Sequence, residues 1–482
     1  MCSERSVPAP TKAFLIGVVL ISLFFACLYQ LGVPLRATHG ARVNGDEPFY
    51  LLTAVSLLED GDLDLANDYD LHRYRAFFHH EQELWYQSRP TADGRILSPH
   101  NIGLSILIMP SYAIAGVDGV KQFLALIGGL TVGLMALLAH RATGYAAASL
   151  LAASMLGFSA PLFVYATQIY PEGPAASVVV FCVWVLLGRS RGVLTGLAAA
   201  VAVTALLWLG SKYIVIGAII SILFVLRLTS LGRASLASVL VANGAFYLWF
   251  HVSTFGGATP YSVNTVYFGN TTAQIVGMHL ELWNRLYRLA GLWIDGEFGL
   301  IRWAPVLLLA LPALPLMTRR MGPGRWVIPL VFAGGFFVAT FLTITMRGWW
   351  FPGRMMITVL PLLAVPLAYT LSRLPYFAVL SWAAALLAAY SFGITLALYI
   401  ETLGEGVVLA VDPFAMLWPP FAMASSLFPV YDSYEISTWL LTGLWILLGA
   451  GFVMLSRRNV FKTALELTGE REGDHQDTVE VA

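Results

Sequence analysis

The sequence predicts an all-α polytopic membrane protein with about twelve transmembrane helices. Of its 482 residues, 58% are hydrophobic and only 12% are charged, whereas soluble globular chains have about 45–50% apolar and about 25% charged residues. Twenty-eight basic residues balance 28 acidic ones, so the chain has no net charge that would attract nucleic acid. This composition excludes a soluble enzyme, a disordered protein and a nucleic-acid binder.

Twelve apolar segments are candidates for the transmembrane helices, because roughly 20 mostly apolar residues are needed to cross the bilayer. The first segment has only a modest basic flank and is followed by no convincing small-residue cleavage site. We therefore interpret it as a retained span and not as a removable signal peptide. The twelve segments are residues 12–32, 120–139, 146–165, 174–188, 193–210, 213–228, 236–252, 300–318, 326–345, 354–371, 375–399 and 437–456.

The distribution of arginine and lysine predicts the orientation, because cytoplasmic loops carry an excess of both. With the N-terminus in the cytoplasm, every second short loop is basic. Both termini are then cytoplasmic, and the chain divides into a transmembrane domain, residues 1–456, and a polar tail, residues 457–482. The basic residues of these loops and the tail are Arg141, Arg189, Arg191, Arg227, Arg233, Arg319, Arg320, Arg325, Arg373, Arg457, Arg458 and Lys462.

Residues 102–116 are apolar but short, with Pro110 in their middle. Counting them as a span would reverse every later loop and place the arginine-rich loops outside. We therefore predict a helix that lies at the outer interface or dips into it. The long polar stretches, at about 33–119, 253–299 and 400–436, then all form extracytoplasmic loops, and function concentrates in such loops.

Three carboxylates near the outer ends of spans are candidates for chemistry. Asp46 and Glu47 follow the first span in the sequence Asn-Gly-Asp-Glu-Pro, which is equally typical of a helix start capped by the aspartate. Glu172 could also be a helix cap, but it is almost the sole charge between residues 142 and 188. Isolated carboxylates at the edge of a bilayer are costly and usually functional.

Four cationic residues at outer helix ends break the positive-inside trend. The arginine fork matches phosphate oxygens in a bidentate way, and lysine supplies a point charge. We interpret these residues as ligands of an anion, with snorkelling to lipid headgroups as the alternative. They are Lys212, Arg302, Arg347 and Arg354.

Several short motifs follow one another on the predicted outer face: Asp46-Glu47, Gly61-Asp62-Leu63, Ser98-Pro99-His100, Tyr170-Pro171-Glu172 and Gly353-Arg354. In this order they resemble the membrane-embedded glycosyltransferases of the GT-C class, which use polyprenyl-phosphate sugars. That class includes protein O-mannosyltransferases and the aminoarabinose transferase for lipid A. The likeness covers nearly the whole chain, although each motif alone is weak. One departure is that Ser98-Pro99-His100 replaces the Lys-Pro-Pro segment of those enzymes.

The resemblance implies a GT-C fold in the inner or plasma membrane of a prokaryote. It also implies transfer of a sugar, with inversion, from a polyprenyl-phosphate donor to an extracytoplasmic lipid, glycan or protein. No cofactor is implied with certainty, and a divalent cation is left open because some relatives use one. The implied roles are catalysis by Asp46, as general base, and Glu47; orientation of the acceptor or a metal by Glu172, His100 and Tyr170; and donor-phosphate binding by Lys212, Arg302, Arg347 and Arg354.

A transporter of a lipid-linked or small anionic substrate is the main alternative, because twelve spans are common among transporters. Such proteins usually show internal repeats and broken helices that carry charge at the midplane of the bilayer. The sequence shows no repeat, and its ionisable groups lie at the ends of the spans. A non-catalytic assembly protein of the cell envelope is a third interpretation, under which the clustered carboxylates would have no purpose.

Overall fold

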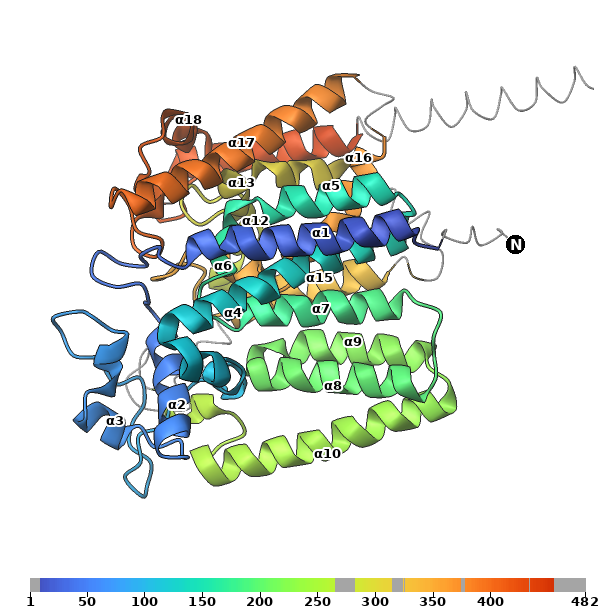
Figure 1. Cartoon of the computed structure of the whole chain (residues 1–482). Coiled ribbons are helices and arrows are strands. Elements are labelled where there is room, and N and C mark those ends of the chain that lie inside the picture. Colours follow the sequence, from blue (N-terminus) through green and yellow to red (C-terminus); the bar gives the residue numbers. More distant parts are fainter. Residues whose placement is uncertain are drawn as a thin grey trace, which may run out of the picture.

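The computed structural model describes residues 9–264, 282–313, 324, 326–373, 378–432 and 434–454. In this part of the chain the secondary structure is helical, and the helices form a bundle (Figure 1). One isolated antiparallel bridge joins Ser88 to Asn264. The predicted all-α class is confirmed. The polar tail at 457–482 and the basic residues Arg319, Arg320 and Arg325 lie outside the described residues.

Five helical stretches among the described residues are long and apolar enough to cross a membrane. They are Lys12–Gly32, which contains α1 (Lys12–Tyr29); Gly103–Thr143, which is α4; Ser230–Val263, which contains α10 (Ser230–Phe255); Ser381–Leu403, within α17 (Ala378–Leu403); and Ile436–Met454.

The other predicted spans contain shorter or interrupted helices. Proline accounts for part of this, since it removes a backbone donor and clashes with the preceding turn: Pro305 and Pro312 lie in the range predicted as one span at 300–318. Non-helical backbone at membrane depth is tolerated where protein surrounds it. The elements are α5 (Ala146–Gly157), α6 (Ala160–Tyr165), α7 (Glu172–Leu186), α8 (Val193–Leu209), α9 (Ile214–Arg227), α13 (Leu300–Trp303), η6 (Pro305–Ala313), α15 (Val327–Phe337) and α16 (Ala364–Leu371).

The helix α4 breaks where the interfacial segment was predicted to end. Ala115 and Gly116 have non-helical backbone angles, with φ +57° at Gly116. A Cβ atom on Gly119 would lie 2.3 Å from the carbonyl oxygen of Ser111, whereas residues eight apart in a straight helix are about 12 Å apart along its axis. The chain therefore folds back sharply at this point. The first arm of α4 is thus separate from the span that follows, as the sequence indicated.

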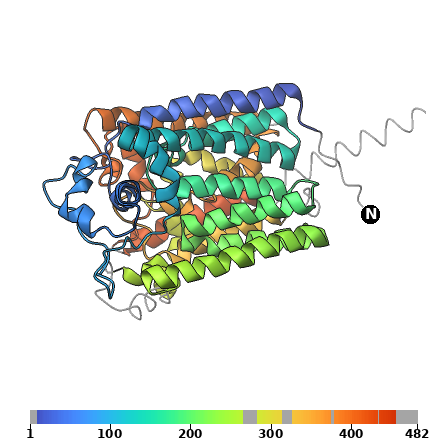
Figure 2. The ribbon, with the colours of Figure 1, turned by 60° about the horizontal axis from the view of Figure 1, so that its bottom comes forward.

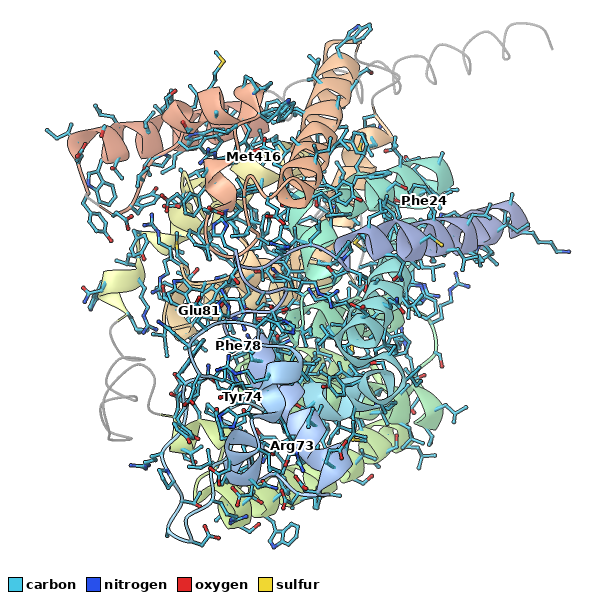
Figure 3. All side chains as sticks on the ribbon, turned by 60° about the vertical axis from the view of Figure 1, so that its left-hand side comes forward. Phe24, Arg73, Tyr74, Phe78, Glu81 and Met416 are labelled. Carbon is cyan, nitrogen blue, oxygen red and sulfur yellow. The ribbon has the colours of Figure 1, made fainter. Side chains whose placement is uncertain are left out.

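The helix α2 (Glu47–Glu59) lies across one end of the bundle, transverse to the long helices, and is seen end-on in Figure 2. The first loop beside it is folded. Arg73 donates a hydrogen bond of 2.8 Å to the buried Asp68 and a second bond to Asp60, which directly follows α2. Figure 3 brings this end forward and labels Arg73 and, next to it, Tyr74. The loop is therefore a packed cap on the bundle.

Segments of the three predicted outer loops contact one another at this end. The bridge between Ser88 and Asn264 joins the first loop to the second. The N–H of Leu409, in the third loop, donates to the carbonyl oxygen of Arg36, in the first loop, at 3.0 Å. Loops that contact one another lie on the same side of the membrane, so the chain crosses the membrane an even number of times between them. The predicted spans give an even number only when residues 102–116 do not cross.

Small residues allow α1 and α4 to pack closely. A Cβ atom on Gly129 would lie 2.5 Å from both the backbone nitrogen of Ala26 and the carbonyl oxygen of Ser22. A Cβ atom on Gly133 would lie 2.0 Å from Ser22 Oγ. Small residues that let backbones approach are a common basis of helix packing in membranes, where the hydrophobic effect supplies little force between helices.

We expect Gly129→Val to destabilise the protein by about 1–3 kcal/mol, because overpacking a tight contact forces neighbouring backbone to move. The measurement is the melting temperature of the purified chain in detergent. Gly449→Val is the matched control, since a Cβ atom there meets no described atom within 4 Å. Equal melting temperatures for the two variants would contradict the close approach of α1 and α4.

A topology assay tests which face of the membrane carries the loops. A reporter that is active only outside the cytoplasm should work when fused after Gly256 or Gly404 and fail after Gly192. The reason is that the first two positions lie in the loops that meet at the capped end, and Gly192 lies in a predicted basic loop. Activity in the opposite pattern would mean that the capped end is cytoplasmic.

Candidate functional site

Four charged side chains singled out by the sequence form one ion cluster. Arg354 Nη2 donates to Asp46 Oδ2 at 2.8 Å, and Arg354 Nε donates to Glu172 Oε1 at 2.9 Å. Lys212 Nζ donates to the same Glu172 oxygen at 2.7 Å. Two carboxylates thus balance two cations. The fold brings Asp46 and Arg354 together from positions 308 residues apart in the sequence.

Each of these side chains lies at the start of a helix or in a short helical turn. Asp46 immediately precedes α2, and Glu172 is the first residue of α7. Lys212 and Arg354 lie in the short turns η3 (Ser211–Tyr213) and η9 (Arg354–Met356). Asp46 makes no side-chain cap hydrogen bond with α2. Its carboxylate is therefore directed to Arg354, and the helix-cap alternative does not describe its contacts.

Two aromatic rings fix the orientation of the Arg354 guanidinium. Its central carbon lies 3.8 Å from the ring centre of Tyr170 and 4.9 Å from that of Trp350. Arginine favours such stacking on aromatic faces. The side chain is only 5% exposed. Among the described residues, Nη1 is the one guanidinium nitrogen without a hydrogen-bond partner.

Gly45 lets the Asp46 turn approach this stack. Its φ is +60°, a left-handed conformation that glycine adopts without strain. A Cβ atom there would lie 2.8 Å from the hydroxyl oxygen of Tyr170 and 3.1 Å from the carbonyl oxygen of Trp349. The Tyr170 hydroxyl also donates to the carbonyl oxygen of Asn44 at 3.1 Å. The sequence analysis did not single out Gly45, although Asn-Gly is a strong turn signal.

Glu47, expected to act in catalysis, has both carboxylate oxygens occupied by backbone groups. Oε2 accepts the N–H of Asn44 at 2.8 Å, and Oε1 accepts the N–H of Ile169 at 2.7 Å. The side chain is 1% exposed, and this burial raises the pKa of the Glu47 carboxyl, with Lys121 as the main opposing charge. Glu47 therefore ties the turn that carries Asp46 to the segment that leads to Glu172.

Asp46 retains an accessible oxygen beside His100. Asp46 Oδ1 lies 3.9 Å from His100 Nε2, and the aspartate side chain is 22% exposed. Burial by itself would raise the pKa of Asp46, but the positive charge of Arg354, assisted by His100 and Lys212, lowers this pKa to about 2. Arg354 thus keeps Asp46 ionised and also suppresses its basicity.

His100 is held by a partner that the sequence analysis did not identify. Its Nε2 is 2.7 Å from Gln87 Oε1. Burial lowers the pKa of His100, and the Asp46 carboxylate only partly offsets this effect. The imidazole is therefore neutral at neutral pH, where it can exchange hydrogen bonds without carrying a charge.

The cluster does not fit a divalent cation. Among the described residues, no three histidine, cysteine, aspartate or glutamate side chains are grouped to hold a metal ion. Arg354 and Lys212 already balance Asp46 and Glu172, and the guanidinium bridges the two carboxylates. A metal ion would have to displace it. Glu172 Oε2, however, is a buried oxygen without a partner in the described structure.

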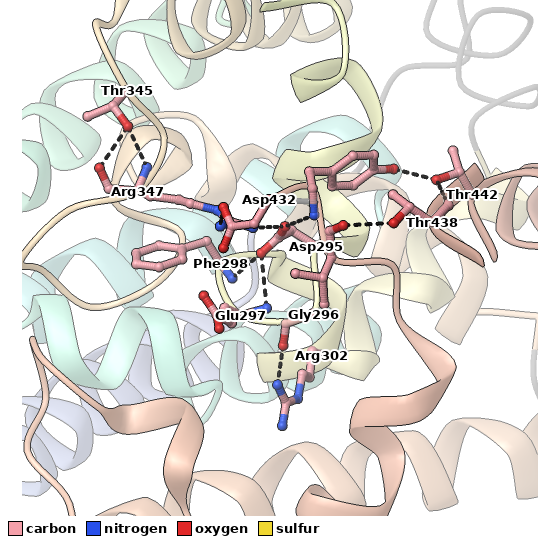
Figure 4. Close-up of polar contacts among 12 residues, drawn as sticks. Asp295, Gly296, Glu297, Phe298, Arg302, Thr345, Arg347, Asp432, Thr438 and Thr442 are labelled. Atoms are coloured by element: carbon pink, nitrogen blue, oxygen red, sulfur yellow. Dashed lines mark hydrogen bonds and ion pairs between the residues drawn. The ribbon is translucent and has the colours of Figure 1, made fainter. Parts of the chain in front are cut away.

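Arg347, expected to bind phosphate, belongs to a second polar group (Figure 4). Its Nη2 donates to the buried Asp295 at 2.7 Å, and its Nη1 bonds to Asp432. Asp295 also accepts the N–H groups of Glu297 and Phe298, at 3.0 and 2.8 Å. This group joins three separate loop segments and shares no hydrogen bond with the Arg354 cluster.

Arg302, the other expected phosphate ligand, also lies in this second group. Its Nη1 donates to the carbonyl oxygen of Gly296, and its guanidinium lies 4.2 Å from the ring centre of Phe421. The structure therefore does not bring Arg302 or Arg347 into contact with Arg354. The acidic members Asp295 and Asp432 escaped the sequence analysis, because nothing in their local sequence indicates which arginine they meet.

A small apolar pocket of about 30 Å³ adjoins the segment that carries Glu172. It lies between α1, α4, α6 and α7 and is lined by residues such as Tyr29, Leu124 and Leu162. Two lining residues lead to the cluster: Gly173 directly follows Glu172, and the hydroxyl of Tyr165 donates to the carbonyl oxygen of Phe351. The ion cluster and this apolar pocket are therefore neighbours.

No protein-family model matches the sequence, and no curated protein matches it in a sequence search. The structure is similar to that of ArnT from Cupriavidus metallidurans in the apo state, with a TM-score of 0.50 and 16% identity over 93% of this chain and 73% of that one. A weaker match is the same ArnT bound to undecaprenyl phosphate, with a TM-score of 0.47 and 16% identity over 93% of this chain and 78% of that one. Another is the archaeal oligosaccharyltransferase AglB from Archaeoglobus fulgidus in complex with an inhibitory peptide and a dolichol-phosphate, with a TM-score of 0.44 and 13% identity over 83% of this chain and 56% of that one.

At this identity the likeness to ArnT shows the fold. The chain has the GT-C fold that its motifs predicted, in a polytopic membrane protein.

We expect Glu47→Gln to lower the stability of the protein by about 1–3 kcal/mol, because an amide can accept only one of the two backbone hydrogen bonds and leaves a buried donor unpaired. The melting temperature of the purified chain measures this. Glu59→Gln, at the exposed end of the same helix, is the control and should melt like the wild type. Loss of activity without any loss of stability would instead assign Glu47 a direct chemical role.

Proposed function

We propose that this protein is an integral membrane glycosyltransferase that transfers a sugar from a polyprenyl-phosphate donor to an extracytoplasmic acceptor. The observation that carries this proposal is the ion cluster in which Arg354 and Lys212 meet Asp46 and Glu172. It combines phosphate-binding cations with a carboxylate that can accept a proton. The GT-C fold, shared with ArnT, supports the same class of enzyme.

Arg354 and Lys212 bind the donor phosphate. The Nη1 edge of Arg354 is free to receive a phosphate oxygen, and Lys212, with 31% of its side chain exposed, can reorient toward it. Charge-assisted bonds from these groups stabilise the negative charge that develops as the phosphate leaves. The isoprenoid chain extends into apolar surroundings, and a small apolar pocket between α1 and α7 lies next to Glu172.

Asp46 acts as the general base. The acceptor hydroxyl attacks the anomeric carbon and forms the new C–O bond, while the bond from that carbon to the phosphate oxygen breaks. The electron pair of the broken bond leaves with the phosphate, and the hydroxyl proton passes to Asp46. A single displacement of this kind inverts the anomeric centre. His100, Tyr170 and Glu172, which contact Asp46 or Arg354, orient the acceptor.

The remaining roles follow from this placement. Glu47 positions the Asp46 turn, while Arg302 and Arg347 hold the loops around the site instead of contacting the phosphate. The site faces the extracytoplasmic side, where a lipid, a glycan or a protein serves as acceptor, and both termini are cytoplasmic. A transporter receives less support, because the ion cluster lies at helix ends beneath a packed cap.

We expect Asp46→Asn to reduce the rate of transfer by about 10²–10⁴, because an amide cannot accept the proton at neutral pH. The measurement is sugar transfer by the purified chain with a panel of polyprenyl-phosphate sugars. Asp118→Asn is the matched control, since Asp118 pairs with Arg42 outside the cluster and is half exposed. Wild-type transfer rates in Asp46→Asn would remove the base assignment.

A further inference from the structure

A buried asparagine side chain holds the turn between α8 and α9. Directly after α8, Gly210 has an extended backbone, so the helix stops there. In a continuous α-helix the N–H of Ser211 would donate to the carbonyl oxygen of Leu207. Here both groups bind the side-chain amide of Asn101 instead. Its Oδ1 accepts the N–H of Ser211 at 3.1 Å, and its Nδ2 donates to the carbonyl oxygen of Leu207 at 3.2 Å. The amide therefore takes the place of a missing helical hydrogen bond.

The contacts of Asn101 fix its orientation. A backbone N–H can only donate and a carbonyl oxygen can only accept, so the two backbone partners determine which end of the amide faces each of them. Nδ2 also donates to the hydroxyl oxygen of Tyr247, in α10, at 2.8 Å. The side chain is 6% exposed. The backbones are close as well, because a Cβ atom on Gly103 would lie 2.4 Å from the carbonyl oxygen of Trp208. Asn101 is thus held between the start of α4, the end of α8 and α10.

The turn that Asn101 holds carries Lys212. This lysine is the next residue after the N–H that the amide binds, and its Nζ donates to Glu172 at 2.7 Å. Asn101 itself directly follows His100, whose Nε2 is 3.9 Å from Asp46 Oδ1. The short segment His100-Asn101 therefore reaches the ion cluster in two ways, directly through the imidazole and indirectly through the lysine turn.

We propose that Asn101 is a positioning residue that places the Lys212 ammonium beside Arg354 for the donor phosphate. This inference rests on the proposed function and adds to it a residue that acts only through the lysine turn.

The physical reason is the length of the lysine side chain. Its ammonium is a point charge on a flexible four-carbon stem, so the backbone that carries it decides which positions it can reach. Without the amide of Asn101, the N–H of Ser211 and the carbonyl oxygen of Leu207 both lose their partner, and the turn shifts to find others. Hydrogen bonds weaken steeply when their geometry is lost. A shifted turn therefore lowers the affinity for a phosphate and leaves the affinity for an uncharged polyprenol chain unchanged.

A binding measurement on the full chain in nanodiscs tests the proposal. The Kd values of undecaprenyl phosphate and of uncharged undecaprenol are measured for the wild type and Asn101→Ala, and their ratio gives the preference for phosphate. Asn101→Ala should lower this preference about tenfold, because about one charge-assisted hydrogen bond is lost.

A milder variant keeps the test decisive if Asn101→Ala does not fold. Asn101→Ser retains a polar group, but its hydroxyl stops one bond short of the amide atoms that bind Ser211 and Leu207. It should also lower the preference for phosphate. An unchanged preference in a folded Asn101 variant would overturn the proposal and leave the proposed function standing.

Asn243→Ala is the matched control. Its Oδ1 accepts the indole N–H of Trp208 at 2.9 Å, so this variant also removes an asparagine amide that joins α8 to α10. It should lower the melting temperature and leave the preference for phosphate unchanged. An equal loss of preference in Asn243→Ala and Asn101→Ala would mean that any loosening of α8 has this effect, and would overturn the specific role of Asn101.

A double-mutant cycle shows whether Asn101 acts through Lys212. In the Lys212→Met background, Asn101→Ala should change the preference by less than about threefold, because the ammonium that the turn positions is already gone. A further tenfold loss would mean that Asn101 supports the site by another route, and would overturn the proposal. Equal affinity of the wild type for undecaprenyl phosphate and undecaprenol would instead contradict the donor site of the proposed function, and the role of Asn101 with it.

Discussion

The pairing of Arg354 with two carboxylates is the constraint on which the rest of the site depends. A guanidinium that is 5% exposed has to be neutralised, because an unpaired buried charge is severely destabilising. Asp46 and Glu172 supply the compensating charges from the starts of α2 and α7, and Lys212 balances the second of them. The cluster thus holds the first loop against the bundle, and a small apolar pocket lies next to Glu172. In the proposed function, the same charges serve structure before the donor binds and chemistry afterwards.

The surrounding groups bring the cluster together. Glu47 joins the Asp46 turn to the segment before Glu172, and Gly45 allows that turn to approach Tyr170. On the other side of Arg354, the loop that begins near Arg347 is tied to Asp295 and Asp432. These supports use backbone hydrogen bonds and ion pairs outside the cluster. They therefore hold the cluster without using its own charges.

Much of the fold and part of the site could be predicted from the sequence. Apolar length indicated the helical segments, and the short run around Pro110 indicated a separate helix, which the break at Gly116 explains. Asp46, Glu172, Lys212 and Arg354 were identifiable because charge at the edge of a bilayer is conspicuous. Local sequence could not separate Arg347 from Arg354, since the difference between them lies in partners far along the chain. Nor could it show that Glu47 has both oxygens occupied by backbone groups.

The central claim is that the cluster around Arg354, and not the group around Arg347 and Arg302, receives the donor phosphate. Photocrosslinking with a polyprenyl phosphate that carries a reactive group on its phosphate end tests this most directly, with the labelled residues identified by mass spectrometry. The account predicts labels at Tyr170, Lys212 and Trp350, the neighbours of Arg354 and Glu172 in the cluster. Labels confined to Glu297, Phe421 and Asp432 would contradict it and would place the donor phosphate in the second group.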